Sequence, residues 1–349
     1  MPDGRVEIEM LMPTVGPAAK AIHEFVGTDV VYRDGAYANN SKGGRASLAR
    51  FAWFVVAYNV AAIVWGAYVR ATGSGGGCGT HWPLCNGEVL PKAPQAQTMI
   101  EFSHRVSSGV SLALVALLLV WCWRRTAKGD WPRRSAIAAA VLLLNEAVLC
   151  AFLVLINHLG GLGQSATHAL FLCLHFGNTL CLLAALTLTA SWLSSTYPRP
   201  AFLRKPYQMT ATALGLLSAM IIGITGSLAS LGDTLFSANS LPQALLQDFS
   251  SSSPILLRVR ALHPIAAVIG SLFLLWLFRV FRRKQEPSAW LSLLPFTLAV
   301  QIALGVLNVS LLAPICLQMT HLLVAELFWI LLVLASADQM RPVPIGGTS

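Results

Sequence analysis

Four histidines, His104, His175, His263 and His321, each lie near the start of a strongly apolar stretch of this sequence. An imidazole inside lipid is energetically costly unless it binds a ligand or faces a polar cavity, so each is a candidate functional residue. Imidazole is also a good ligand for iron, zinc and copper. We therefore expect two sites in which a pair of histidines binds a metal or a haem. The alternative is that each histidine only makes a hydrogen bond between helices.

Haem fits these pairs better than zinc does. A closed zinc site takes about four nitrogen or sulfur ligands, and each pair offers two at the same depth. Haem needs only axial ligands from the protein, and an apolar helical bundle suits its macrocycle. Within each pair, both histidines come from helices that run in the same direction, so that their imidazoles can face each other. Bis-histidine iron sites are therefore feasible in both cases.

Glu101 is the one acidic side chain that we expect beside a predicted site, because it precedes His104 by three residues. Positions three apart are neighbours on a helix surface. The carboxyl group could transfer a proton or bind a reacting oxygen atom. The alternative is an acid that only interacts with the helix dipole. The corresponding position before His263 is Arg260, so the two sites should differ chemically, as they would if one reacts while the other transfers electrons or holds a cofactor.

Cys78 and Cys85 are expected in a loop on the exoplasmic side of the membrane, which is an oxidising compartment in bacteria. A disulfide bond between them is therefore predicted. It could be a structural clip or a redox-active pair that passes electrons. The other five of the seven cysteines lie in apolar stretches without metal-binding spacing, and we expect them to be packing residues.

The elements that carry these residues are predicted to be membrane-spanning helices. Of the 349 residues, 55% are hydrophobic and 11% are charged, which leaves too little polar surface for a soluble globular protein. A helix needs about 20 apolar residues to cross the hydrocarbon. Eight runs meet this standard: residues 51–70, 99–123, 136–157, 166–194, 208–231, 255–281, 289–312 and 316–337. The sequence therefore predicts an all-α polytopic membrane protein.

Lysine and arginine set the expected orientation, because cytoplasmic loops carry an excess of both. Basic clusters precede the first run, join the second to the third and the fourth to the fifth, and follow the sixth. The polar segments 1–48 and 339–349 are therefore expected in the cytoplasm, and the histidines towards the exoplasmic side. The net charge of +9 follows from this topology and gives no reason to expect a nucleic-acid partner.

Four arginines at the exoplasmic level are not explained by this rule. They lie at the depth of the histidines, which makes them candidate partners for haem propionates: Arg70, Arg105, Arg258 and Arg260.

An internal repeat divides the chain into two halves. The tripeptide Thr-Gly-Ser ends the first run at Ser74 and the fifth run at Ser227. Each copy is followed by an exoplasmic loop and then by a helix with an early histidine. The segment that begins at Asn145 aligns with the one that begins at Gln301. We predict two pseudo-symmetric four-helix halves, residues 49–196 and 207–338, related by an axis along the membrane normal.

Several motifs of this sequence resemble those of haem A synthase. They are Arg-Ala-Thr-Gly-Ser-Gly at 70–75, Cys-Gly and Trp-Pro-Leu-Cys-Asn-Gly within 78–87, Glu-Phe-Ser-His-Arg at 101–105 and Leu-His-Phe-Gly at 174–177. The resemblance implies a bacterial inner-membrane enzyme that oxidises the C8 methyl group of haem O to the formyl group of haem A, for cytochrome c oxidase. Its implied partners are haem O, membrane lipid, haem O synthase and an electron donor.

The same resemblance implies roles for individual residues. His104 and His175 would flank the substrate haem O, with Glu101 assisting the chemistry. His263 and His321 would bind the iron of a haem b cofactor. The first half would then hold the substrate site and the second half the cofactor site, and the cysteine pair would form the loop disulfide.

Two other functions share some of these features. A quinol-linked dihaem cytochrome b also binds haems between histidine pairs, but it usually places them at different depths, whereas these four histidines share one side. A non-catalytic haem carrier or oxidase-assembly scaffold would need the histidines but neither Glu101 nor the cysteines. Chemical analysis of extracted haems separates the three functions.

Overall fold

The computed structural model describes residues 29–92, 94–158, 166–194, 206–284 and 289–339. The chain divides into two compact units, Met1–Ser47 and Leu48–Ser349. The described residues form helices and loops without a β-strand. Eight of the described helices are long and apolar enough to cross a membrane. The prediction of an all-α polytopic membrane protein with eight spans is therefore confirmed.

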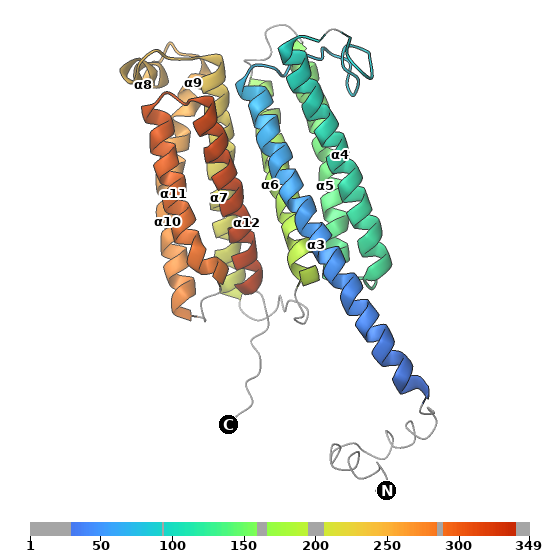
Figure 1. The fold of residues 1–349 in the computed structure, drawn as a ribbon. Helices are drawn as coiled ribbons and strands as arrows, with labels where there is room; N and C mark the ends of the chain where they lie inside the picture. The colour runs from blue at the N-terminus through green and yellow to red at the C-terminus, as the bar shows by residue number, and fades with distance from the viewer. Residues whose placement is uncertain (1–28, 93, 159–165, 195–205, 285–288, 340–349) are drawn as a thin grey trace, which may run out of the picture. The chain divides into compact units, whose positions relative to one another are not determined.

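Within the larger unit, from Leu48 onward, the long helices stand in two groups (Figure 1). The first group contains α3 (Asp29–Ala71), α4 (Ala96–Arg125), α5 (Trp131–His158) and α6 (Ala166–Ser194). The second group contains α7 (Pro206–Leu235), α10 (Leu262–Lys284), α11 (Ala289–Ser310) and α12 (Ile315–Gln339). The short helices α8 (Leu241–Phe249) and α9 (Ile255–Arg260) connect α7 to α10.

Helix α3 begins much earlier than the sequence predicted. The first span was expected from residue 51, whereas α3 begins at Asp29 and its membrane-crossing part at Gly44. No proline interrupts residues 29–71, and a helix that has nucleated extends at little cost where nothing breaks it. Part of the predicted polar extension 1–48 is therefore helical; its residues 1–28, like residues 340–349 of the predicted tail, lie outside the described residues.

The sixth predicted span, residues 255–281, is divided in the structure. Helix α9 ends at Arg260 and α10 begins at Leu262. Pro264 explains the division, because proline has no N–H to donate to the carbonyl of Arg260 four residues earlier and its ring clashes with that carbonyl. His263 consequently lies in the first turn of α10.

Helix α6 packs against α7 and α12, and so joins the two groups. The indole Nε1–H of Trp329 on α12 donates a buried hydrogen bond of 2.8 Å to the carbonyl of Leu180 on α6. A methyl group added at Gly223 of α7 would lie 2.8 Å from the ring of Phe176. Lipid is as apolar as these side chains, so close packing and hydrogen bonds hold the helices together.

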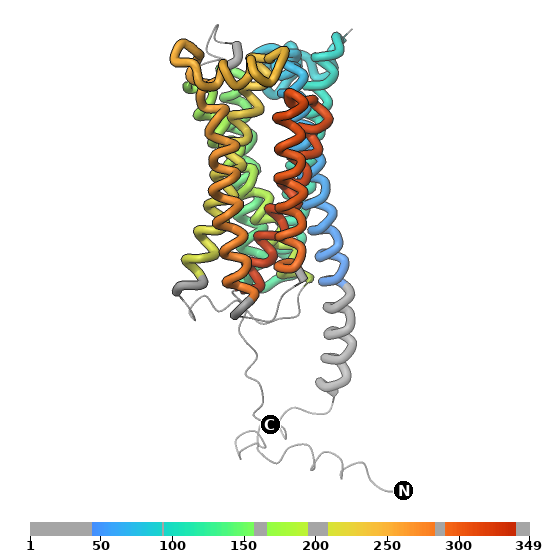
Figure 2. Tube along the Cα trace, turned by 90° about the vertical axis from the view of Figure 1, so that its left-hand side faces the viewer, coloured from blue at the N-terminus to red at the C-terminus, as the bar shows by residue number. Residues whose placement is uncertain are grey.

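The two connecting loops that flank the histidine helices lie at the same end of the bundle. The loop between α3 and α4 and the α8–α9 segment are both at the top in Figures 1 and 2. Arg124 and Arg125 end α4 at the opposite end, where Arg133 and Arg134 begin α5. The loops are thus placed close to the helix ends that carry the histidines.

Candidate functional site

Three of the four histidines lie against a glycine of the preceding long helix. The pairs are Gly66 with His104, Gly226 with His263 and Gly305 with His321. A methyl group at Gly66 would lie 2.8 Å from Cε1 of His104, closer than real Cβ atoms approach. At Gly226 the distance to Cε1 of His263 would be 3.0 Å. The absence of a side chain at Gly66 and Gly226 makes room for the imidazole rings.

His263 and His321 form the second-half site. Their ring centroids are 6.4 Å apart and their planes are nearly perpendicular. A metal–imidazole bond is about 2.0 Å and the ring nitrogen lies roughly 1.1 Å from the centroid, so two axial imidazoles on one metal have centroids about 6.2 Å apart. The observed separation therefore fits a bis-histidine haem iron. In addition, Nδ1 of His321 is buried without a hydrogen-bond partner in the described part of the chain.

Each second-half histidine also meets a polar side chain of its neighbouring helix. Nδ1 of His263 lies 3.4 Å from the hydroxyl of Thr225 on α7. Nε2 of His321 lies 3.2 Å from the amide nitrogen of Gln301 on α11. The partners in these two contacts are a hydroxyl and an amide, so neither of them is acidic.

His104 on α4 and His175 on α6 are the two histidines of the first half. Nδ1 of His104 is buried without a partner among the residues that the structure describes. Nδ1 of His175 instead lies 3.2 Å from a carboxylate oxygen of Glu146 on α5. It also lies 3.9 Å from the sulfur of Cys150. The structure therefore places an acid beside one of the two histidines that the sequence paired.

Glu146 is a site residue that the sequence reasoning missed. Glu101 is therefore not the only acidic side chain beside a predicted histidine. The repeat aligned Asn145 with Gln301, but the residue that contacts the histidine in the first half is the next one, Glu146. The sequence did contain an indication of Glu146, because an ionisable residue in the middle of an apolar span is itself a functional candidate. Glu326, buried in α12 with neither carboxylate oxygen partnered among the described residues, met the same criterion.

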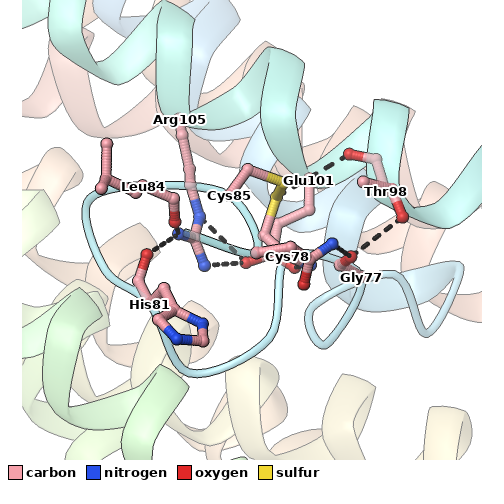
Figure 3. Close-up of polar contacts among 9 residues, drawn as sticks. Gly77, Cys78, His81, Leu84, Cys85, Thr98, Glu101 and Arg105 are labelled. Carbon is pink, nitrogen blue, oxygen red and sulfur yellow. Dashed lines mark hydrogen bonds and ion pairs between the residues drawn. A yellow bond between two sulfur atoms is a disulfide. The ribbon is translucent and has the colours of Figure 1, made fainter. Parts of the chain in front are cut away.

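Glu101 is buried and joins α4 to the loop between α3 and α4 (Figure 3). The backbone N–H of Cys78 donates to its Oε2 at 2.8 Å. Its Oε1 accepts from Nε and Nη2 of Arg105, at 3.1 and 2.6 Å. These donors hold the carboxyl group in place one helical turn before His104. The residue thus ties the loop to the helix that carries a predicted ligand.

The loop itself is closed by the predicted disulfide between Cys78 and Cys85, which the structure confirms. Arg105 extends the link by donating from Nη1 to the carbonyls of His81 and Leu84. The Thr98 hydroxyl donates to the Gly77 carbonyl at 2.9 Å. A methyl group at Gly77 would come within 2.6 Å of the α4 backbone, so the loop lies directly on the start of that helix.

The four candidate propionate partners have different surroundings. Arg105 is committed to the loop, and Arg260 donates to carboxylate oxygens of Asp248 at 2.7 Å and Asp233 at 3.0 Å. Arg70 reaches from α3 to the Ser230 hydroxyl on α7 at 3.1 Å, but its Nε is buried without a partner within the described ranges. Arg258 is exposed. Arg70 and Arg258 therefore have the greater capacity left for an anionic group.

Comparison with known proteins identifies the family to which this chain is similar. Residues 49–333 match the family model described as cytochrome oxidase assembly protein. A protein named heme A synthase from Shouchella clausii is 30% identical over 279 residues, which cover 77% of this chain and 89% of that protein. Another of that name, from Alkalihalophilus pseudofirmus, is 40% identical over 123 residues, which cover 35% of this chain and 38% of that protein.

A longer relative carries a different name. A protein from Thermus thermophilus named protoheme IX farnesyltransferase is 38% identical over 300 residues, which cover 84% of this chain but 48% of that protein. This chain thus spans about half the length of that relative. A name given to the whole relative does not say which half carries the named activity.

Proposed function

We propose that this chain, which belongs to the family of cytochrome oxidase assembly proteins, is a haem A synthase. The substrate would be haem O and the reaction the oxidation of its C8 methyl group to a formyl group. The observation that carries the proposal is the arrangement of four histidines as two pairs at one end of the bundle. Two relatives named heme A synthase support it.

The second-half site is proposed to hold a haem b cofactor. The 6.4 Å separation of the His263 and His321 rings matches two axial ligands of one iron. When bound there, haem supplies one-electron redox chemistry. The chain contributes the two ligands and Gly226, which makes room for the His263 ring. Gln301 and Thr225 hold the two rings in place through uncharged contacts.

The first-half site is proposed to bind haem O between His104 and His175. Glu101 is the proposed acid–base residue, because it is buried one turn from His104 and lies at the loop end of the site. Its bonds to Arg105 and to the Cys78 amide hold the carboxylate in a fixed position. A group held in this way can accept or return a proton without having to reorganise.

The proposed reaction replaces two hydrogen atoms of a methyl group by one oxygen atom, which is a four-electron oxidation. Two molecules of dioxygen are the oxidant: they supply the oxygen atom, accept these four electrons and four more from an electron donor, and leave three molecules of water. An electron-transfer partner is therefore part of the proposal, with haem O synthase as the source of the substrate. The propionates of the haems are assigned to Arg70 and Arg258, the two arginines with donors left over. The protein is placed in the bacterial cell membrane with both termini in the cytoplasm, because basic residues gather at the end of the bundle away from the histidines.

The test is to express the chain in a bacterium that makes haem O but no haem A, and to identify the extracted haems. The proposal expects haem A to appear. A quinol-linked dihaem cytochrome or a haem carrier would leave haem O unchanged, and a farnesyltransferase would increase haem O at the expense of haem b. Each of these outcomes contradicts the proposal.

A further inference from the structure

We infer that Glu146 is a positioning residue for the substrate site: its carboxylate accepts a hydrogen bond from Nδ1 of His175, turns Nε2 towards the bound haem and makes this histidine a stronger donor to iron than its second-half counterpart. The inference rests on the proposed function, because it assigns a difference in chemistry to the two sites. It concerns the chain's own residues, so it can be tested without turnover.

The contact between the two side chains is close and partly shielded from solvent. Oε1 of Glu146 lies 3.2 Å from Nδ1 of His175, and the two side chains are 13% and 27% exposed. When one ring nitrogen of a histidine donates to a carboxylate, the other is left unprotonated and free to bind a metal. Nε2 of His175 is thereby the nitrogen that faces the site.

Two further donors hold the carboxylate in its acceptor role. The hydroxyl of Thr179 contacts Oε1 and the side-chain amide of Asn178 contacts Oε2. Asn178 is itself fixed by a 2.9 Å bond from its amide to the carbonyl of Leu142 and by accepting from Asn145 at 2.8 Å. Donors to both oxygens hold the carboxyl group in one orientation. The network therefore fixes the position of the oxygen that faces Nδ1 of His175.

The second half contains no such network at the matching positions. Gln301 contacts Nε2 of His321 at 3.2 Å, whereas Glu146 contacts Nδ1 of His175. The residues three and four positions after His321 are Val324 and Ala325, whereas those after His175 are Asn178 and Thr179. A neutral amide cannot supply a negative charge, and the apolar residues could not anchor one. The asymmetry between the halves thus lies in residues that contact the histidines.

A carboxylate behind a ligating histidine raises the basicity of the ligand, and loss of such a partner typically costs about 10- to 100-fold in metal affinity. A more basic ligand favours the ferric over the ferrous iron. The haem held by His175 should therefore be easier to oxidise than it would be with a neutral partner. Such a bias would help a site in which the substrate itself must lose electrons.

The experiment uses the full-length protein in detergent, loaded with ferric protohaem IX as the probe. Redox titration with visible spectroscopy gives a midpoint potential for each haem component. The first-half component is the one that is missing from His175→Ala protein. The main variant is Glu146→Gln, which keeps the size of the side chain but removes its charge. Gln301→Glu is the reciprocal variant, since it adds a carboxylate beside Nε2 of His321 in the other half.

Glu146→Gln should raise the potential of the first-half component and leave the second unchanged. A tenfold loss of preference for ferric haem corresponds to about 59 mV for a one-electron couple. Gln301→Glu should lower the potential of the second-half component. An unchanged first-half potential in Glu146→Gln, or an equal shift of both components, would overturn the inference and leave Glu146 a structural residue.

Two arrangements keep the test decisive. If Glu146→Gln protein keeps no first-half haem, the comparison passes to Gln301→Glu, and an unchanged second-half potential overturns the inference. The potentials are measured with protohaem and without turnover, so they can be obtained even from a protein that makes no haem A. Failure of the proposed function is then seen in the haem extracts and failure of this inference in the potentials.

Discussion

Replacement of Gly66 by alanine should separate the function of the first-half site from the folding of the protein. The new Cβ atom would lie 2.8 Å from Cε1 and 3.0 Å from Nε2 of His104. Carbon atoms in favourable contact are about 3.5–4.0 Å apart, so the imidazole must move by roughly 1 Å. The atoms in conflict belong to a side chain, and the helix backbone can stay where it is. The ring is displaced, but the helix is retained.

A displacement of about 1 Å in a catalytic site can cost about 100-fold in rate. We therefore expect Gly66→Ala to insert into the membrane at the wild-type level, to retain the second-half haem, and to lose about 100-fold in the rate of haem A formation. The rate is measured in isolated membranes supplied with haem O, relative to the amount of protein.

Two control variants accompany this measurement. Gly109→Ala lies on the same helix as His104, and its methyl group would meet no atom within 4 Å. Gly305→Ala places a methyl group 3.4 Å from His321, which is ordinary contact. Both should keep most of the activity. Wild-type activity in Gly66→Ala would show that the position of His104 does not matter, and would refute the reasoning.

Three further outcomes are expected. The purified protein should show the spectrum of a low-spin six-coordinate b-type haem, and His263→Ala or His321→Ala should abolish it in protein that still inserts; a full spectrum in both variants would contradict the second-half site. Thiol labelling of unreduced, denatured protein should spare Cys78 and Cys85, and reduction should expose them; free labelling without a reductant would contradict the bond. Glu101→Ala should keep the haem b spectrum and lose about 100- to 10,000-fold in conversion, whereas normal amounts of haem A would reduce Glu101 to a structural role.

Much of the fold could be predicted because the membrane imposes simple rules. A span must be long and apolar, so all eight spans could be located from hydropathy. The sequence also contains the cause of the break before His263, since Pro264 disrupts the helical hydrogen bond to Arg260. The early start of α3 could not be predicted, because the polar residues before Gly44 carry no hydropathy signal for a span.

The site was predictable where its residues lie on one helix and not where they meet across helices. The spacing of Glu101, His104 and Arg105 placed all three at the start of α4. The contact between Glu146 and His175 depends on how α5 rotates against α6, which hydropathy does not determine. The use of Arg105 and Arg260 to hold the loops likewise depends on where those loops fold back, so the sequence could not separate them from Arg70.

The central claim is that this chain converts haem O to haem A at the histidine pair of its first half. The most direct measurement is mass spectrometry of the haem recovered after the purified protein, loaded with haem b, is incubated with haem O, an electron donor and dioxygen. The account predicts that haem A accumulates with the wild-type protein, and that none forms with a His175→Ala protein that still shows its haem b spectrum. Recovery of unchanged haem O from the wild-type protein, or an equal yield of haem A from His175→Ala, would contradict it.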